Sequence, residues 1–268
     1  MPRADGLRLA VTTLSVLPAR GPAALDRRLG GAAMLWAPAV GLALAVPVAA
    51  LLIGARTATG DTSLLPPVLA VALLALLTRG LHLDGLADTV DGLGSYRRGD
   101  EALAVMRRGD SGPLGVAAVV LVLLADCAAL KVAVAEHQGT VAVVAALVSG
   151  RLALTVSCRT GAVAAPGSRL GAVVIGTVPP LAAAAVVGLA VVACGAVALL
   201  DPHAPHHRAE VAQALLAPLV AVAVTSLLGR HANRRLGGLT GDVLGAQVEL
   251  AQLVALVVLA TGANAPGG

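Results

Sequence analysis

The chain has 268 residues, of which 57% are hydrophobic and only 13% are charged, and its formal net charge is +4. A soluble globular chain carries about 25% charged residues, so this one has about half the charge needed to cover a water-facing surface. The composition therefore indicates an integral membrane protein. Its long apolar blocks, which differ from the short alternating segments of outer-membrane barrels, predict an all-α polytopic bundle of about seven transmembrane helices.

Seven stretches approach the length of about 20 residues that a spanning helix needs. They cover residues 31–54, 63–81, 112–135, 139–158, 171–200, 211–229 and 243–262. Residues 1–30 contain an apolar run too short to span, so we expect a cytoplasmic or interfacial segment and no signal peptide. The fifth stretch contains Pro179 and Pro180 and is expected to be kinked or to begin as a re-entrant piece. The whole chain, residues 1–268, is expected to form one integral membrane domain.

Basic residues are concentrated on alternate connections. Fifteen of the nineteen Lys and Arg residues precede the first span or lie in the second-to-third, fourth-to-fifth and sixth-to-seventh connections. Only Arg56 and Arg208 lie in the opposite connections. Because short cytoplasmic loops accumulate Lys and Arg, we predict a cytoplasmic N-terminus and the inner membrane of a bacterium. This bias explains the positive net charge, and no nucleic-acid motif occurs, so no nucleic-acid partner is expected.

Residues 79–111, between the second and third spans, are predicted to form a cytoplasmic catalytic region. Asp84, Asp88 and Asp91 follow an i, i+4, i+7 spacing, which places their carboxylates within about 60° of one helix face. Such carboxylates repel one another, and no Lys or Arg one turn away neutralises them. Mg²⁺ suits a few carboxylates completed by water and substrate phosphates. The sequence therefore favours a metal site over the alternative, a solvated acidic face.

Four neighbouring residues are candidates for substrate contact. His82 projects from another side of the expected helix and is interpreted as a hydrogen-bonding or phosphate-contacting residue. Arg107 and Arg108 either belong to the general positive charge of a cytoplasmic loop or clamp phosphate oxygens. Asp110 either caps the third span or joins the metal site.

Residues 230–242 are predicted to form a cytoplasmic loop that leads into the last span. Asp242 and Glu249 are seven residues apart and therefore share one face of that span, after the flexible entry at Gly241. Carboxylates in or beside a span are costly and usually mark function. We expect this face to meet the first acidic cluster across the bundle.

The remaining charged groups are interpreted as structural. Asp126, Lys131 and Arg151, in the third and fourth spans, are expected to be intramembrane pairing partners. The string from His203 to Glu210 lies in a connection predicted outside and reads as a solvated loop. Three cysteines without C-x-x-C spacing suggest neither a disulfide framework nor a zinc site.

Three segments resemble the motifs of the cobalamin synthase family, the adenosylcobinamide-GDP ribazoletransferases. They read GLHLDGLADTVDGL, VMRRGDSGPLG and GGLTGDVLGAQVEL. Family members show GxHLDGLADxxDG and, near the C-terminus, GGxTGDxLGAxxEL. The order and spacing match, and the resemblance covers nearly the whole chain.

The resemblance implies a Mg²⁺-dependent membrane transferase for the last step of cobalamin nucleotide loop assembly. It would join adenosylcobinamide-GDP to α-ribazole or its 5′-phosphate, giving adenosylcobalamin or its phosphate and GMP. The implied metal ligands are Asp84, Asp88, Asp91 and Asp242, with Asp91 or Asp88 accepting a proton. The implied substrate contacts are His82, Arg107, Arg108, Asp110, Thr240 and Gly241. The expected partners are these small molecules and the lipid bilayer, and a homo-oligomer is compatible with the sequence.

Two other functions fit parts of the pattern. A CDP-alcohol phosphotransferase also places aspartates at the cytosolic end of a span, but its Arg after D-G-x-x-A is missing, since Asp88 follows Ala87 directly. An ion-coupled transporter would explain intramembrane acids and kinked spans. A transporter should also show an internal repeat, and the sequence shows none.

Overall fold

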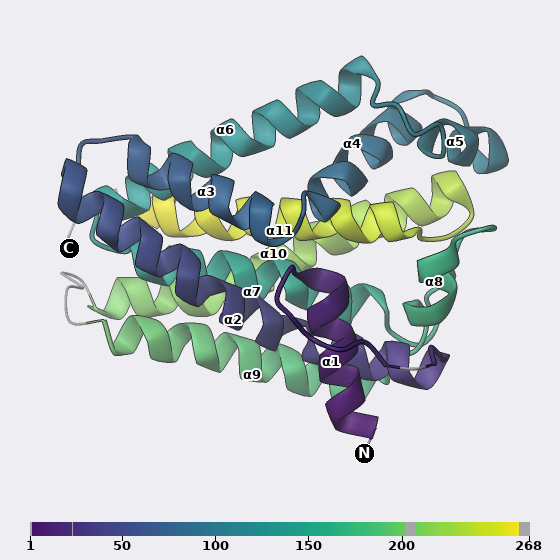
Figure 1. Cartoon of the computed structure of the whole chain (residues 1–268), viewed down its shortest axis with the longest axis horizontal. Coiled ribbons are helices and arrows are strands. Elements are labelled where there is room, and N and C mark those ends of the chain that lie inside the picture. The colour runs from purple at the N-terminus through teal and green to yellow at the C-terminus, as the bar shows by residue number, and fades with distance from the viewer. Residues whose placement is uncertain (1, 23, 202–206, 263–268) are drawn as a thin grey trace.

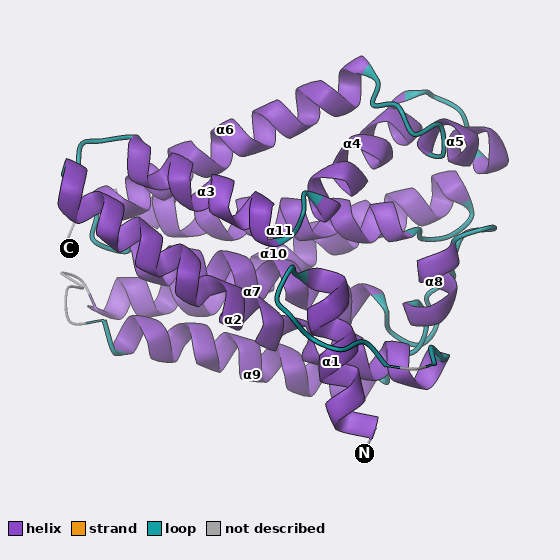
Figure 2. Cartoon of the chain, viewed as in Figure 1, coloured by secondary structure: helices purple, strands orange, loops and turns teal. Residues whose placement is uncertain are grey.

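The structure is a computed structural model that describes residues 2–22, 24–201 and 207–262, and the regular elements of these residues are all helices (Figure 2). Most of the long helices lie side by side along the longest axis of the molecule (Figure 1). In chain order the helices are α1 (Pro2–Leu14), α2 (Arg27–Thr59), α3 (Leu65–Leu77), α4 (Leu81–Gly94), α5 (Gly99–Met106), α6 (Pro113–Ala135), α7 (Gly139–Ser157), α8 (Arg169–Val174), α9 (Pro180–Leu199), α10 (His207–Leu236) and α11 (Gly241–Gly262).

Six of the described helices are long and apolar enough to cross a bilayer, namely α2, α6, α7, α9, α10 and α11. Helix α7 forms the centre of the bundle, because it packs against α2, α9, α10 and α11 and is buried along nearly its whole length. The others expose apolar side chains on their outer faces, such as Val46, Leu121 and Leu189. The predicted class, a polytopic helical membrane bundle, is confirmed.

The predicted second span, residues 63–81, is broken. Helix α3 has 13 residues, and α4 follows it after a bend of 89°. The bend occurs where Arg79 (φ 56°) and Gly80 (φ 64°) adopt the left-handed conformation, and the Gly80 N–H donates to the Ala75 carbonyl oxygen over 2.9 Å. The predicted number of seven spans is reached only if the bent pair is counted as one span, whose second half, α4, was predicted to lie in the cytoplasmic region. The bend directs α4 away from α3 and along α6 and α11.

The predicted fifth span, residues 171–200, is also interrupted. Residues 169–174 form the short helix α8, and α9 begins only at Pro180, since proline is favoured in the first turn of a helix and cannot donate inside one. Between them the chain pairs with the end of α7, where the Thr160 N–H donates to the Val178 carbonyl oxygen over 2.8 Å. The expected interruption is confirmed, and the spanning helix is shorter than predicted.

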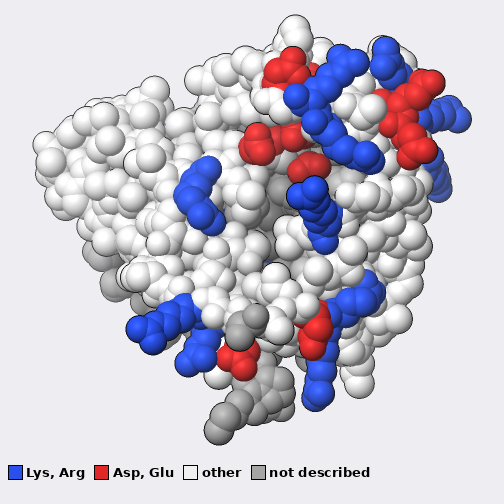
Figure 3. Space-filling view, turned by 45° about the vertical axis from the view of Figure 1, so that its right-hand side comes forward, with Lys and Arg blue, Asp and Glu red and all other residues white. Residues whose placement is uncertain are grey.

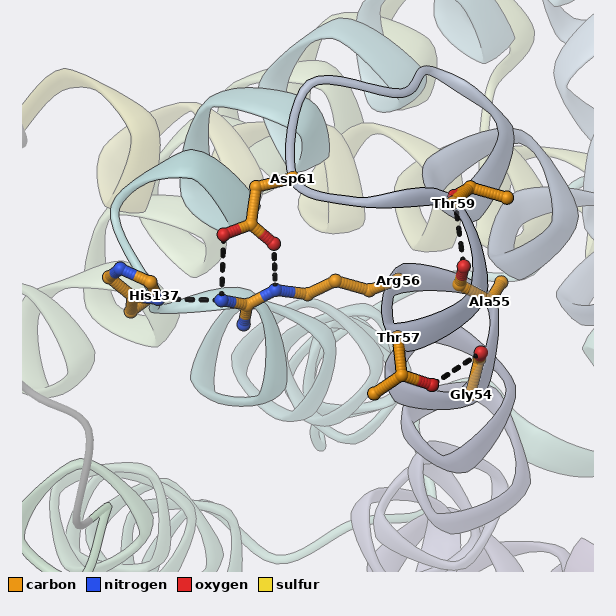
Figure 4. Close-up of polar contacts among 7 residues, drawn as sticks. All are labelled: Gly54, Ala55, Arg56, Thr57, Thr59, Asp61 and His137. Carbon is orange, nitrogen blue, oxygen red and sulfur yellow. Dashed lines mark hydrogen bonds and ion pairs between the residues drawn. The ribbon is translucent and has the colours of Figure 1, made fainter.

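Charged side chains at the opposite end of the bundle from α5 and α8 connect loops to helices (Figure 4). Arg56 donates through Nη2 to Asp61 Oδ2 over 3.2 Å, and the same nitrogen lies 2.6 Å from His137 Nδ1. This contact with Arg56 lowers the pKa of Asp61. Lys131 donates to the carbonyl oxygen of Thr62, so the prediction that Lys131 pairs inside the membrane is wrong, because its long side chain reaches the loop at the bundle end.

A buried polar network links α7 to α11. The fully buried Arg151 donates to Gln252 Oε1, and Gln252 Nε2 donates to Glu249 Oε2 over 3.2 Å. Asp126 of α6 is also buried and is close enough to Glu249 to interact electrostatically. The structural role expected for Arg151 is therefore confirmed, with partners on α11. Of the string His203–Glu210, residues 203–206 lie outside the described residues, and Glu210 is buried in α10.

Candidate active site

The acidic stripe of residues 79–111 lies on one helix, as its spacing predicted. Helix α4 carries Asp84 in its first turn and Asp88 and Asp91 beyond it. Asp84 is exposed, and the other two are partly buried. Partial burial, with the neighbouring carboxylates of Asp84, Asp242 and Asp91, raises the pKa of Asp88 to about 6. The stripe therefore concentrates negative charge that its own helix does not neutralise.

Helices α4 and α11 touch through glycines beside these acids. A Cβ added to Gly85 would lie 2.7 Å from the carbonyl oxygen of Asp242 and 3.2 Å from the Cα of Gly245. A Cβ on Gly245 would in turn lie 3.3 Å from the Cα of His82. Small residues permit such close backbone contact between membrane helices. The crossing brings Asp242 to the acidic stripe, and the predicted meeting of the two acidic motifs is confirmed for Asp242.

A cavity of about 300 Å³ lies at this crossing. Six predicted site residues line it, from α4, the end of α5 and the start of α11: His82, Asp84, Arg107, Thr240, Gly241 and Asp242. Viewed with this end of the bundle forward, acidic and basic side chains gather on the same face, while much of the remaining visible surface is uncharged (Figure 3). The cavity therefore joins carboxylates, an imidazole and the guanidinium group of Arg107 from three separate motifs.

Arg107 and His82 differ in whether their polar atoms already have hydrogen-bond partners. Arg107 donates through Nη2 to the carbonyl oxygen of Pro166 over 3.1 Å, which holds the side chain at the cavity wall. His82 is 3% exposed, and neither ring nitrogen has a hydrogen-bond partner within the described residues. Burial lowers the pKa of His82 well below its usual value, so the ring is neutral and can both donate and accept. Since an unpaired buried polar group is costly, His82 is available to a ligand in the cavity.

Asp91 has a structural partner that the sequence did not indicate. Its Oδ2 accepts from the Gly112 N–H over 2.6 Å and its Oδ1 from the Gly115 N–H over 2.9 Å. These donors belong to the start of α6, where Gly112 offers no capping side chain. Asp110, for which capping this helix was one of two predicted alternatives, is exposed and accepts neither N–H group within the described residues, so the capping alternative is wrong. A carboxylate from α4 caps α6 because the two helices pack together.

Five predicted residues do not line the cavity. Asp88 and Asp91 lie outside its lining, although Asp84 of the same helix belongs to it. Arg108 and Asp110 are exposed on the connection between α5 and α6 and do not line it. Glu249 contacts Gln252 in the core, two turns from Asp242. Within residues 2–22, 24–201 and 207–262, no three His, Cys, Asp or Glu side chains lie close enough together to hold a metal ion by themselves.

Several walls of the cavity were missed by sequence reasoning. Thr13 and Leu14 of α1 line it, so the N-terminal segment contributes to the site. Residues 166–170, which include Ser168 and Arg169, form another wall. The only signal for this loop was its pair of basic residues, since no local pattern shows that a loop after α7 folds over the start of α11.

The fold and the site together define an integral membrane protein with an acidic, arginine-bearing cavity at one end of a helical bundle, a composition suited to phosphate chemistry. The chain belongs to the family described as cobalamin-5-phosphate synthase, whose model matches residues 6–260. This membership decides against the phospholipid-enzyme and transporter alternatives.

Curated relatives agree with the family match. A protein of Frankia casuarinae is 44% identical over 94% of this chain and 93% of its own, and one of Nocardioides sp. is 40% identical over 96% and 98%. A third, from Corynebacterium efficiens, is 37% identical over 96% and 91%. All three carry the name adenosylcobinamide-GDP ribazoletransferase. No solved structure matches the chain.

Proposed function

We propose that this protein joins adenosylcobinamide-GDP to α-ribazole or α-ribazole 5′-phosphate, giving adenosylcobalamin or its 5′-phosphate and releasing GMP. The relatives named above support the substrates. The observation that carries the proposal is the convergence of Asp84 and Asp242, from two distant family motifs, on one cavity with Arg107. This convergence of anionic and cationic groups supports the proposal that the diphosphate reacts at this cavity.

In the proposed reaction, a ribose hydroxyl of the ribazole attacks the phosphorus that is attached to cobinamide. A new P–O bond forms, the bond from this phosphorus to the oxygen bridging to GMP breaks, and the hydroxyl proton leaves. Such a transfer depends mostly on positioning and on neutralising charge. Arg107 lies at the cavity wall to contact phosphate oxygens, and the neutral ring of His82 can hydrogen-bond a substrate oxygen.

Asp88 is assigned as the acceptor of the hydroxyl proton. It does not itself line the cavity, but it is partly buried one turn from Asp84 and is close enough to Asp84 and Asp242 to interact with both electrostatically. Asp84 is assigned to the metal ion, which leaves Asp88 for the proton. Asp91 is assigned a positioning role, since both of its oxygens accept backbone N–H groups of α6. Thr240 caps α11 by accepting the Val243 N–H over 3.1 Å, and so holds the following Gly241 and Asp242 at the cavity.

The donor set at the cavity fits Mg²⁺. Asp84 and Asp242 both line it, and neither forms an ion pair with Lys or Arg within the described residues. Mg²⁺ is commonly bound by one or two carboxylates completed by water and substrate phosphates, which agrees with a site where three protein carboxylates are not gathered in advance. Asp84 and Asp242 would hold the ion, which would neutralise charge on the diphosphate.

The orientation proposed for the chain places this cavity in the cytoplasm of a bacterium, at the inner membrane. Its support is the distribution of basic residues, since Arg27, Arg107, Arg169 and Arg235 all lie at the cavity end. The test is a cysteine introduced at Asp100 or at Thr62 in a chain whose three native cysteines are alanine. In intact spheroplasts a membrane-impermeant maleimide should label the cysteine at Thr62 and leave that at Asp100 unlabelled.

The activity is tested with purified protein in nanodiscs, supplied with adenosylcobinamide-GDP, α-ribazole and Mg²⁺. GMP and the cobalamin product are quantified by chromatography. The parental enzyme should form both in equal amounts, and Asp84→Asn and Asp242→Asn should each lose roughly a hundredfold or more of the rate, in line with the removal of groups that stabilise developing charge.

Asp100→Asn is the matched control, because Asp100 is an exposed acid of α5 at the same end of the bundle and does not line the cavity. It should keep the parental rate. Absence of GMP release from folded parental protein would overturn the proposed function, and full activity of both cavity variants would overturn the site.

A further inference from the structure

A second cavity, of about 470 Å³, lies at the same end of the bundle between the ends of α7 and α10 and the second turn of α11. A short pairing separates it from the acidic cavity. The Leu239 N–H donates to the Val163 carbonyl oxygen and the Ala165 N–H to the Leu239 carbonyl oxygen, both over 2.8 Å. Leu239 lines the second cavity and Thr240 lines the first, so the two spaces share a wall.

The charge of the second cavity differs from that of the first, which is lined by Asp84, Asp242, Arg107 and Arg169. Its only charged lining residues are Arg159 and Arg230, and the described chain contributes no Asp or Glu to the lining. Two guanidinium groups without a carboxylate repel one another, and an anion with several oxygens is the ligand that they fit best. We call this space the arginine cavity.

Other arginines at this end are already used by the fold. Arg27 donates to the carbonyl oxygens of Ala172 and Ile175, and Arg235 donates to those of Leu93 and Arg97. Each therefore connects two segments of the chain.

The arginines of the second cavity differ from these. Arg159 uses only Nε, which donates to the Val156 carbonyl oxygen over 2.9 Å, and Arg230 has no hydrogen bond or ion pair within the described residues. The terminal guanidinium nitrogens of both residues are thus left for a ligand.

A buried amide adds a second, independent indication of a ligand. Gln247 lines the arginine cavity and is 1% exposed. Its Nε2 donates to the Thr225 carbonyl oxygen over 2.8 Å, which fixes the amide orientation, while Oε1 has no partner within the described residues. An unpaired buried acceptor is costly, so Oε1 calls for a donor such as a hydroxyl group. Gly229 leaves room for this amide, since a Cβ there would lie 2.7 Å from Nε2.

We propose that the arginine cavity binds the phosphate group of a hydroxyl-bearing ligand, with Arg159 and Arg230 contacting the phosphate and Gln247 Oε1 accepting from a hydroxyl. Two sources have this chemistry. One is α-ribazole 5′-phosphate, whose assignment as a substrate rests on the proposed function. The other is a lipid headgroup such as phosphatidylglycerol, because the cavity lies at one end of the spanning helices α7 and α10.

The first arm of the test measures equilibrium binding of radiolabelled α-ribazole 5′-phosphate and α-ribazole to protein in phosphatidylcholine nanodiscs. If the cavity binds the substrate phosphate, the double variant Arg159→Gln, Arg230→Gln should bind the phosphorylated probe at least roughly tenfold more weakly, as expected for losing charge-assisted hydrogen bonds. Binding of unphosphorylated α-ribazole should change less than about twofold. Arg234→Gln is the control, because Arg234 is exposed nearby on α10 and does not line the cavity.

The second arm measures retained lipid by native mass spectrometry, with phosphatidylglycerol compared with phosphatidylcholine. If the cavity binds a headgroup, the parental protein and Arg234→Gln should retain phosphatidylglycerol preferentially and the double variant should lose that preference. A selective loss in either arm supports the inference and identifies the source. If the folded double variant matches the parental protein in both arms, the inference is overturned.

GMP release is followed in parallel, so that the two proposals can fail separately. Binding through the arginines without any GMP release would overturn the proposed function and leave the phosphate site standing. Normal GMP release with binding that is unaffected by the double substitution would overturn the phosphate site and leave the proposed function standing.

Discussion

Gly85 of α4 lies directly against the backbone of Asp242 in α11, where an added Cβ would be 2.7 Å from the Asp242 carbonyl oxygen and 3.0 Å from its Cα. Both neighbours are backbone atoms, which cannot rotate away. The glycine therefore sets the distance between the two helices that carry the acids. Because Asp84 precedes Gly85 directly, the same contact positions its carboxylate relative to that of Asp242.

We expect Gly85→Ala to separate α4 from α11 and to lower both stability and activity. Overpacking of this kind costs about 1–3 kcal/mol, and the displaced acids should reduce GMP release by tenfold or more. Thermal unfolding in detergent and the rate of GMP release measure the two effects. Gly94→Ala is the control on the same helix, because the methyl group would meet only the flexible end of Leu114 at 2.7 Å. Equal behaviour of the two variants would contradict the role of the crossing.

Asp91 should behave as a structural residue, in contrast to Asp84. Its carboxylate accepts two N–H groups at the start of α6, so Asp91→Ala should cost about 1 kcal/mol, the usual value of a helix cap. The melting temperature should fall by a few degrees. Asp91→Asn should lose less stability than Asp91→Ala, because its amide oxygen can still accept a hydrogen bond. Asp84→Ala should leave the melting temperature nearly unchanged and abolish GMP release. An Asp91→Ala protein of parental stability without activity would instead indicate a chemical role.

The sequence predicted the helical bundle and the acidic helix well because both depend on local pattern. Apolar length identifies spans, and the i, i+4, i+7 spacing of the aspartates places them on one face wherever the helix lies. The end of the second span near residue 80 was predicted, but the bend of 89° was not, since Arg79 adopts a positive φ that its type does not favour. This backbone conformation is set by the packing of α3 and α4, which the local sequence does not show.

Contacts between distant segments determine the partners of several acidic residues, and the sequence could not predict these partners. Asp110 stands near the start of α6 in the chain, yet Asp91 caps that helix from α4. Glu249 shares a helix face with Asp242, but the buried Arg151 and Gln252 engage it in the core. In both cases the partner comes from a distant segment, and spacing within one helix carries no information about it.

Removal of divalent cations should abolish activity if Asp84 and Asp242 hold Mg²⁺. Dialysis against a chelator should stop GMP release, and added Mg²⁺ should restore it. Asp242→Asn should retain a small rate that needs roughly tenfold more Mg²⁺ for half-saturation, because one anionic donor is lost, while Asp100→Asn should titrate like the parental enzyme. Full turnover after exhaustive chelation would contradict the metal assignment.

The acidic stripe should also leave a signature in the pH dependence of stability. The pKa of Asp88 is raised in the folded protein from 3.8 to about 6, so between about pH 4 and 6 the folded chain holds a proton that the unfolded chain has released. Linkage then requires that stability falls as pH rises through this window. In metal-free buffer, Asp88→Asn should gain thermal stability relative to the parental protein from about pH 4 to 6, and the difference should be constant above that.

The comparison needs melting temperatures at several pH values for both proteins and for Asp100→Asn. Asp100→Asn should run parallel to the parental curve, because its substitution lies outside the stripe. Added Mg²⁺ should reduce the advantage of Asp88→Asn, since a cation beside Asp84 and Asp242 relieves the repulsion that Asp88 experiences. Parallel curves for Asp88→Asn and the parental protein across the window would show that burial and the neighbouring carboxylates do not raise the pKa of Asp88 as the structure indicates.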